Sequence, residues 1–216
     1  APILLLVLAF SLSFSVSAQK AESAKISGFQ DYKLQSKLMN REMPYRVVLP
    51  VNYNNSNEKI FYPVVYLLHG LTGHFDNWTD KTKLIEYAKN YNYIIVTPEG
   101  ENGWYTDSAS VPNDRYETYI VNELLPEIDR KFRTLATREN RFIAGLSMGG
   151  GQTFNIGFAH LDLFSALGVF SSAPGPDFAT KFKTVLEDAK GTNAKLNVFW
   201  YGTGDKDPVF PRAKDT

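Results

Sequence analysis

The sequence RFIAGLSMGGGQTFNIGFAH, residues 141–160, decides the fold. Ser147 interrupts its apolar run, and glycines surround that serine at positions 145, 149, 150 and 151. Glycine is used where a backbone must bend tightly or approach a neighbouring segment closely, because it has no side chain to collide. The pattern therefore predicts a tight bend with Ser147 at its apex.

Ser147 has two competing interpretations. Residues 145–149 match G-x-S-x-G, the strained turn between a strand and a helix that presents a nucleophilic serine hydroxyl. In the alternative interpretation, the serine only caps the helix that follows it. We favour the nucleophile because a strand pattern at 142–144 precedes the motif and a helical pattern at 149–159 follows it. The N-terminus of that helix favours developing negative charge beside the serine.

The rest of the chain alternates between short apolar runs and helical patterns. Residues 26–51 predict two antiparallel strands; further strands are predicted at 62–68, 93–97, 142–144, 166–170 and 196–201, and helices at 79–91, 116–132, 149–159 and 177–190. Pro126 predicts a kink or a break in the second of these helices. Such alternation predicts a mostly parallel sheet with helices on both faces. Ligands of such sheets gather at the carboxyl ends of the strands.

A serine nucleophile needs backbone N–H groups that stabilise the oxyanion of the reaction. One predicted donor is the N–H of Met148, directly after the serine. The second is expected in the loop after an early strand, which here reads His69-Gly70-Leu71-Thr72-Gly73. We assign this second donor to the N–H of Leu71.

A serine nucleophile of this type also needs an acid that follows it in the chain, after a later strand. Asp205 and Asp207 both stand there, beyond the predicted strand at 196–201. Either aspartate is also an ordinary turn residue. We favour Asp205, which follows that strand through a glycine-containing turn.

Together, these motifs resemble one esterase branch of the α/β-hydrolases, which includes S-formylglutathione hydrolases, tributyrin esterase-like enzymes and the feruloyl esterases of carbohydrate esterase family 1. The resemblance runs from about Met43 to Asp205 and rests on segments such as YPVVYLLHGLTG (62–73), ENGWYTDS (101–108), FIAGLSMGGGQTF (142–154) and YGTGD (201–205). It implies an α/β-hydrolase fold and a serine carboxylic-ester hydrolase that works through an acyl-enzyme, with no metal and no organic cofactor.

The resemblance also implies roles for individual residues. Ser147 corresponds to the nucleophile and Asp205 to the acid, with Leu71 and Met148 as the oxyanion donors. Trp104 and Tyr105 correspond to residues that line the pocket for the acyl or alcohol group. The implied substrates are short-chain esters, or acetyl or feruloyl esters linked to carbohydrate.

The catalytic histidine of this family lies well beyond the acid, whereas the chain ends at Thr216. The three histidines present are His69, His74 and His160, and none is expected to serve as the base. We therefore expect a C-terminally truncated domain that lacks its last strand and helix and is a poor esterase or an inactive one. The tail at 208–216 shows neither a helical nor a strand pattern. In the alternative, His74 acts as a substitute base.

Two other functions remain open at this stage. In the first, the chain is a non-catalytic relic that binds acylated ligands in the former pocket. In the second, it is an acyltransferase that uses the same nucleophile. The composition excludes other classes: Lys+Arg and Asp+Glu balance at 23 each, so no nucleic-acid surface is indicated, and there is no cysteine for a thiol nucleophile or a disulfide scaffold. A length of 216 residues fits one domain.

Residues 1–18 predict a secretory signal peptide without its basic n-region. Residues 2–18 are apolar or small and uncharged, and they end in Val16-Ser17-Ala18, a pattern typical of signal cleavage sites. A membrane-spanning helix is the alternative, although such a helix needs about 20 apolar residues. We expect a secreted or periplasmic esterase domain, residues 19–216, with no stable membrane association after cleavage.

Cleavage after Ala18 is directly measurable. We expect mass spectrometry of the exported protein to find an N-terminus at Gln19, because the small residues at 16 and 18 suit a signal peptidase. A product that stays in the membrane with residues 3–18 intact would instead indicate a membrane anchor.

Overall fold

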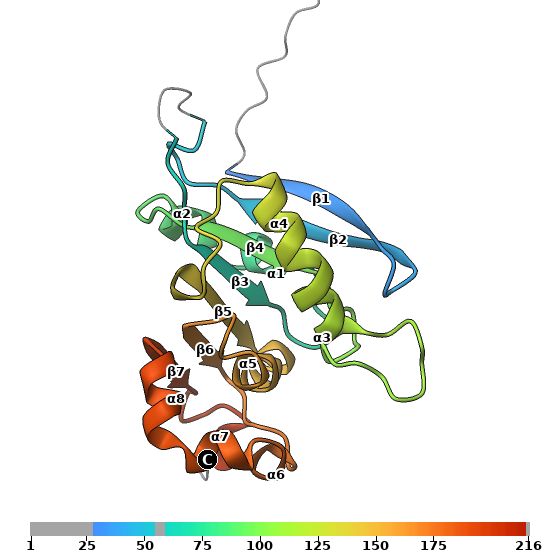
Figure 1. Cartoon of the computed structure of the whole chain (residues 1–216), viewed down its shortest axis with the longest axis vertical. Helices are drawn as coiled ribbons and strands as arrows, with labels where there is room; N and C mark the ends of the chain where they lie inside the picture. Colours follow the sequence, from blue (N-terminus) through green and yellow to red (C-terminus); the bar gives the residue numbers. More distant parts are fainter. Residues whose placement is uncertain (1–27, 55–58, 215–216) are drawn as a thin grey trace, which may run out of the picture.

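A computed structural model describes residues 28–54 and 59–214 of the chain. The predicted signal peptide, residues 1–18, lies outside these described residues. Everything described from β1 onward surrounds one sheet, which crosses the molecule from top to bottom in Figure 1.

Seven strands form this sheet in the order β1-β2-β4-β3-β5-β6-β7. They are β1 (Phe29–Ser36), β2 (Arg41–Val48), β3 (Val64–Leu68), β4 (Ile94–Pro98), β5 (Arg141–Leu146), β6 (Ala166–Phe170) and β7 (Val198–Gly202). β1 and β2 form an antiparallel hairpin, and β2 also pairs antiparallel with β4. The remaining strands are all parallel. The prediction of a mostly parallel sheet is confirmed.

Helices cover both faces of the sheet, as predicted (Figure 1). They are α1 (Asn77–Asp80), α2 (Leu84–Ala88), α3 (Tyr116–Tyr119), the π-helix η1 (Ile120–Leu124), α4 (Leu125–Lys131), the 3-10 helix η2 (Arg138–Asn140), α5 (Met148–Ala159), α6 (Phe178–Lys181), α7 (Lys183–Glu187), α8 (Ala189–Lys195) and α9 (Phe210–Lys214). Among the described residues, none of these helices combines the length and apolar character needed to cross a bilayer.

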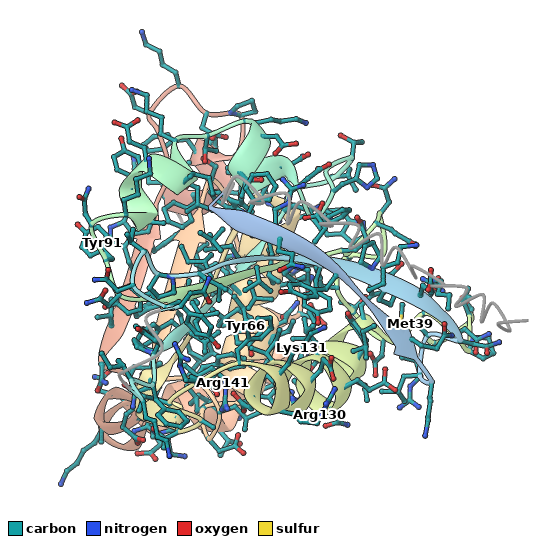
Figure 2. All side chains as sticks on the ribbon, turned by 90° about the horizontal axis from the view of Figure 1, so that it is seen from above. Met39, Tyr66, Tyr91, Arg130, Lys131 and Arg141 are labelled. Carbon is teal, nitrogen blue, oxygen red and sulfur yellow. The ribbon has the colours of Figure 1, made fainter. Side chains whose placement is uncertain are left out.

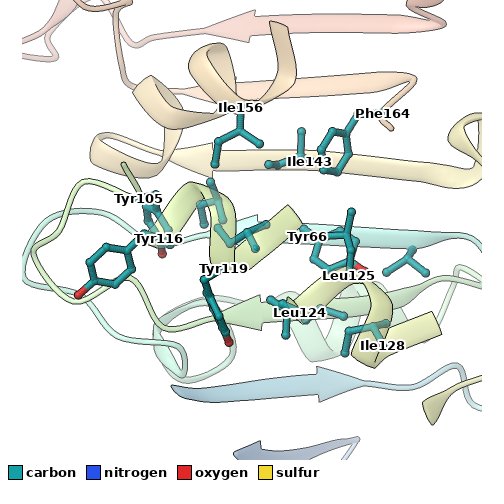
Figure 3. Packing of buried hydrophobic residues seen from close by; sticks show 14 of the residues in the cluster. Tyr66, Tyr105, Tyr116, Tyr119, Leu124, Leu125, Ile128, Ile143, Ile156 and Phe164 are labelled. Atoms are coloured by element: carbon teal, nitrogen blue, oxygen red, sulfur yellow. The ribbon is translucent and has the colours of Figure 1, made fainter. Parts of the chain in front are cut away.

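The alternation of side chains along β3 divides the core into two layers. Val64, Tyr66 and Leu68 face the larger layer, which also contains residues of η1, α4, α5 and α6. Val65 and Leu67 face the smaller layer, beneath α1 and α2. Figure 3 shows the larger layer, where the ring of Tyr66 lies edge-on to the ring of Phe164. Burying each large apolar side chain stabilises the fold by roughly 2 kcal/mol.

An ion pair stabilises the packing of α4 against the sheet. Arg141, at the start of β5, is buried and donates to the carboxylate of Asp129 on α4 at 2.8 Å. Figure 2 shows Arg141 and Tyr66 within the molecule, with Arg130 and Lys131 on the helix beside them.

The two ends of the strands lie on opposite sides of the molecule in Figure 2. Tyr91, which precedes β4, lies on one side, and Met39, at the tip of the β1–β2 hairpin, lies on the other. Tyr91 thus marks the side on which β4 begins, and Met39 marks the side on which β4 ends.

The predicted helix at 116–132 changes type instead of breaking. It runs from α3 through the π-helix η1 into α4, and Pro126 is the second residue of α4. Proline has no N–H to donate and clashes with the carbonyl of the preceding turn in a regular α-helix. We attribute the π-helix directly before Pro126 to this conflict, because π-turns occur where the regular ladder of hydrogen bonds is interrupted.

Two other helix predictions and the prediction for the tail were wrong in detail. The helix predicted at 79–91 is divided into α1 and α2, and the hydroxyl of Thr82 donates to the carbonyl of Trp78 at the division. The helix predicted at 177–190 is replaced by α6, α7 and α8, and the carboxylate of Asp188 caps α8. Short polar side chains at these points bond to backbone groups and compete with a continuous helix. The tail predicted to be irregular contains α9, in which Pro211 occupies the first turn, where proline is tolerated.

β7 is the last strand in the described sheet, and its side chains are exposed, as predicted from the sequence. Val198, Phe199 and Trp200 are 53%, 45% and 47% exposed. Adjacent apolar side chains beside unpaired backbone groups promote association between chains.

We expect the substitution Trp200→Lys to raise the solubility of the 216-residue chain, because a charge on an edge strand opposes strand pairing between molecules. Light scattering at increasing protein concentration measures this effect. Tyr91→Lys is the matched control, since Tyr91 is 61% exposed but lies outside the strands. Equal scattering by the two variants would contradict an origin in β7.

Candidate active site

Ser147 lies at the apex of a strained turn between β5 and α5. Its backbone has φ 53° and ψ −114°, a conformation that is costly for any residue other than glycine. The turn is held on both sides: the N–H of Ser147 donates to Phe170 O at 2.9 Å, and the N–H of Gly151 donates to Ser147 O at 2.9 Å. The serine side chain is exposed. The predicted bend therefore exists, and it presents the hydroxyl to solvent.

Two glycines allow this turn because the backbone segments around them nearly touch. A Cβ atom on Gly145 would lie 2.3 Å from the backbone of Gly149, and a Cβ atom on Gly149 would lie 2.5 Å from Leu68 O. Real Cβ atoms do not approach other atoms so closely. The end of β3, the end of β5 and the start of α5 therefore meet at a single point.

The loop after β3 lies directly beside Ser147. A Cβ atom on Gly70 would lie 3.5 Å from the Cβ atom of Ser147. A turn follows, closed by the N–H of Gly73 donating to Gly70 O at 3.0 Å. Within residues 28–54 and 59–214, the N–H groups of Leu71 and Met148 donate to no protein acceptor. They are thus available to bind an oxyanion next to the serine.

The two candidate acids differ in their contacts. Asp207 accepts a hydrogen bond from the N–H of Val209 at 2.9 Å, so its carboxylate stabilises the turn before α9. Asp205 is exposed, and its carboxylate has no hydrogen-bond partner in the described part of the chain. Asp205 therefore retains the free carboxylate that an acid in this position requires.

Trp104 and Tyr105 occupy a strained loop after β4 but point in different directions. Glu101, Trp104 and Tyr105 all have positive φ, at 45°, 54° and 49°. Trp104 is 51% exposed, whereas Tyr105 is fully buried and its hydroxyl accepts from the N–H of His69 at 2.9 Å. Trp104 can contact a ligand from the surface, while Tyr105 supports the neighbouring loop from inside.

Each histidine is paired with a carboxylate, and none is bonded to Ser147 in the described structure. His69 and His74 both contact Glu99 at 3.2 Å, and His160 contacts Glu117 at 3.1 Å. The structure thus brings together the serine and the two predicted oxyanion donors, without a general base beside them among the described residues.

The sequence patterns do not indicate Glu99, a residue that is only 5% exposed and directly follows β4. Burial alone would raise its pKa, but a hydrogen bond from His69 and backbone hydrogen bonds from Glu101 and Phe75 outweigh burial and lower the pKa to about 2. The only signal in the sequence is a charged residue immediately after a buried strand. Such a position does not distinguish a buried carboxylate from a surface one.

Comparisons with known proteins match the chain to esterases. The family model described as "Putative esterase" matches residues 36–214. An acetyl esterase of Caldicellulosiruptor saccharolyticus is 25% identical over 185 residues, which cover 83% of this chain and 68% of that protein. Three further curated relatives are spanned over only 22–26% of their length.

Solved structures show the same fold. A ferulic acid esterase is 29% identical, with a TM-score of 0.63 and coverage of 77% of this chain and 74% of that one. A fluorophosphonate-binding serine hydrolase of Staphylococcus aureus has a TM-score of 0.73 at 20% identity, with coverage of 87% and 83%. The likeness to the second protein concerns the fold alone.

Glu99 should make the fold sensitive to acid. Its pKa in the folded chain, about 2, lies below the ordinary value of 4.5, so the unfolded chain binds the proton more readily. The stabilisation is complete above about pH 5 and is lost as the pH falls toward 2; about 2 kcal/mol should disappear between pH 6 and pH 3. Urea unfolding of the wild type and Glu99→Gln at both pH values measures this, and the gap between them should narrow at pH 3. A constant gap would show that Glu99 does not titrate in this way.

Proposed function

The chain belongs to the esterase family described as "Putative esterase", and we propose that it hydrolyses carboxylic esters through an acyl-enzyme formed on Ser147. It is an ester hydrolase of the α/β-hydrolase fold. The acyl-enzyme route and the substrate described below are our proposals.

The proposed reaction has two steps. The Oγ atom of Ser147 bonds to the carbonyl carbon of the ester, and the N–H groups of Leu71 and Met148 donate to the oxygen that becomes negative. The bond to the alcohol then breaks, and the alcohol leaves with the proton that the serine gave up. Water next attacks the acyl-enzyme, which releases the acid and restores the serine. In this proposal Asp205 orients a general base, not identified among the described residues, that takes the proton from the serine and gives it to the alcohol.

One observation carries the proposal: an exposed serine in a strained backbone conformation lies beside two backbone N–H groups that lack protein acceptors. A serine that only caps a helix accepts hydrogen bonds from that helix through its side chain. Ser147 makes no side-chain hydrogen bond to the start of α5. Backbone strain at a residue whose side chain does not cap the helix is typical of functional residues.

For the substrate, we propose short-chain esters or acetyl or feruloyl esters linked to carbohydrate. Two relatives of the chain are named acetyl esterase and ferulic acid esterase. The exposed ring of Trp104, in the loop next to the loop that carries Leu71, offers a surface on which an aromatic acyl group or a sugar can stack. We further propose that the protein is exported, on the strength of the uncharged apolar residues 2–18.

Replacement of Ser147 tests the nucleophile. In the complete protein encoded by the gene, Ser147→Ala should lower kcat/KM for p-nitrophenyl acetate by about a thousandfold or more, because the acyl-enzyme can no longer form. A fluorophosphonate probe should label Ser147 in the wild type, and peptide mass spectrometry should locate the label on that residue. Ser110→Ala, which removes the hydroxyl of an exposed serine outside the turn between β5 and α5, is the matched control. Equal turnover by wild type and Ser147→Ala would overturn the proposal.

A further inference from the structure

The buried carboxylate of Glu99 accepts hydrogen bonds from residues of two different loops. Its carboxylate accepts from the N–H of Phe75 at 3.3 Å and lies 3.2 Å from Nδ1 of His74. It also accepts from the N–H groups of Gly100 at 3.1 Å and Glu101 at 2.6 Å. One buried side chain therefore binds the loop after β3 and the loop after β4 at the same time.

The segment 69–75, which we call the oxyanion loop, is bound to Glu99 at both of its ends. At the far end, Phe75 and His74 are the contacts just described. At the near end, both ring nitrogens of His69 have partners: Nδ1 lies 2.8 Å from Gly70 O, and Nε2 lies 3.2 Å from Oε1 of Glu99 and 2.9 Å from the backbone nitrogen of Gly100.

The middle of the oxyanion loop is bound to the same neighbouring loop. The N–H of Thr72, a residue with φ 61°, donates to Oδ1 of Asn102 at 2.9 Å. The N–H of Leu71, one residue earlier, has no acceptor among the described residues. The hydrogen bonds between the loop after β4 and the oxyanion loop thus involve His69, Thr72, His74 and Phe75, and they leave the N–H group of Leu71 available.

We propose that Glu99 is a positioning residue for the oxyanion hole, which holds the oxyanion loop so that the N–H of Leu71 points to the oxyanion formed at Ser147. This inference rests on the proposed esterase function. Glu99 acts through the loop, and we assign it no contact with substrate. Asn102 assists it from the same side.

A carboxylate suits this role better than an amide. An ionised carboxylate only accepts hydrogen bonds, and all its neighbours here except the ambivalent histidine nitrogens are N–H donors. Glutamine would place an NH₂ group against at least one of these donors and lose that bond. A displacement of the Leu71 N–H matters because an oxyanion donor acts in the transition state, so its loss lowers kcat while KM changes little.

The test compares Glu99→Gln with Glu123→Gln in the complete protein. Glu123 is the matched control because its carboxylate also accepts from backbone N–H groups, those of Lys37 and Leu38, but none of its partners belongs to segment 69–75. The active sites are counted by titration with fluorophosphonate, and kcat is calculated per active site. We expect Glu99→Gln to lower this kcat by at least tenfold, with KM within threefold of the wild type. Hydrogen–deuterium exchange should become faster at 69–75 in this variant only.

The opposite result is equally clear. A kcat within twofold of the wild type, or an equal loss in Glu123→Gln, would overturn the positioning role. If Glu99→Gln fails to fold, Asn102→Ala takes its place as the test variant. Asn102 is exposed, and removal of its side-chain amide leaves the N–H of Thr72 without its acceptor. Asn102→Ala should then lower kcat by about threefold to tenfold and raise exchange at 69–75; no change in either would also overturn the inference.

Failure of the esterase proposal is recognised separately. In that case wild type and Ser147→Ala turn over substrate equally, whatever the state of Glu99. The exchange measurement still shows whether Glu99 holds the oxyanion loop, and unchanged exchange in Glu99→Gln would overturn the inference without any reference to catalysis.

Discussion

The contact between backbone and backbone at Gly145 and Gly149 is the constraint on which the site depends. It brings the end of β5 and the start of α5 against the end of β3, at distances that a single Cβ atom would prevent. The unfavourable conformation of Ser147 costs about 1–3 kcal/mol. That cost is offset because α5 buries residues such as Phe154 and Ile156 in the larger core layer and cannot move away from the sheet. The turn is thus strained locally and stabilised globally.

A second constraint connects the loops at the carboxyl ends of β3 and β4. Glu99 is buried and hydrogen-bonded on both oxygens, so removing one of its partners would leave a buried charge incompletely satisfied. An exposed pair such as Lys33–Glu42 on the β1–β2 hairpin contributes far less, because water screens both of its charges. A buried, hydrogen-bonded carboxylate therefore contributes more to holding the two loops together than a surface ion pair would.

Several elements were predictable because their signals are local. The strand at 166–170 and the turn between β5 and α5 follow from short apolar runs and from glycines at set spacings. The helices at 79–91 and 177–190 were predicted too long, because the apolar spacing continues past the points where Thr82 and Asp188 bond to the backbone. Periodicity reports which face of a segment is apolar, whereas these side-chain bonds decide where a helix ends.

The sequence by itself determined a mostly parallel sheet with helices on both faces, and it determined that Ser147 lies at a tight turn, because both depend on patterns within a few residues. Only the tertiary structure decided that Trp104 is exposed while Tyr105 is buried, that Asp207 is engaged while Asp205 is not, and that Glu99 holds two loops together. Each of these outcomes depends on segments that are brought together by strand pairing. The loop at 69–75 and the residues after β4 are far apart in the chain, and no local pattern encodes the hydrogen bonds between them.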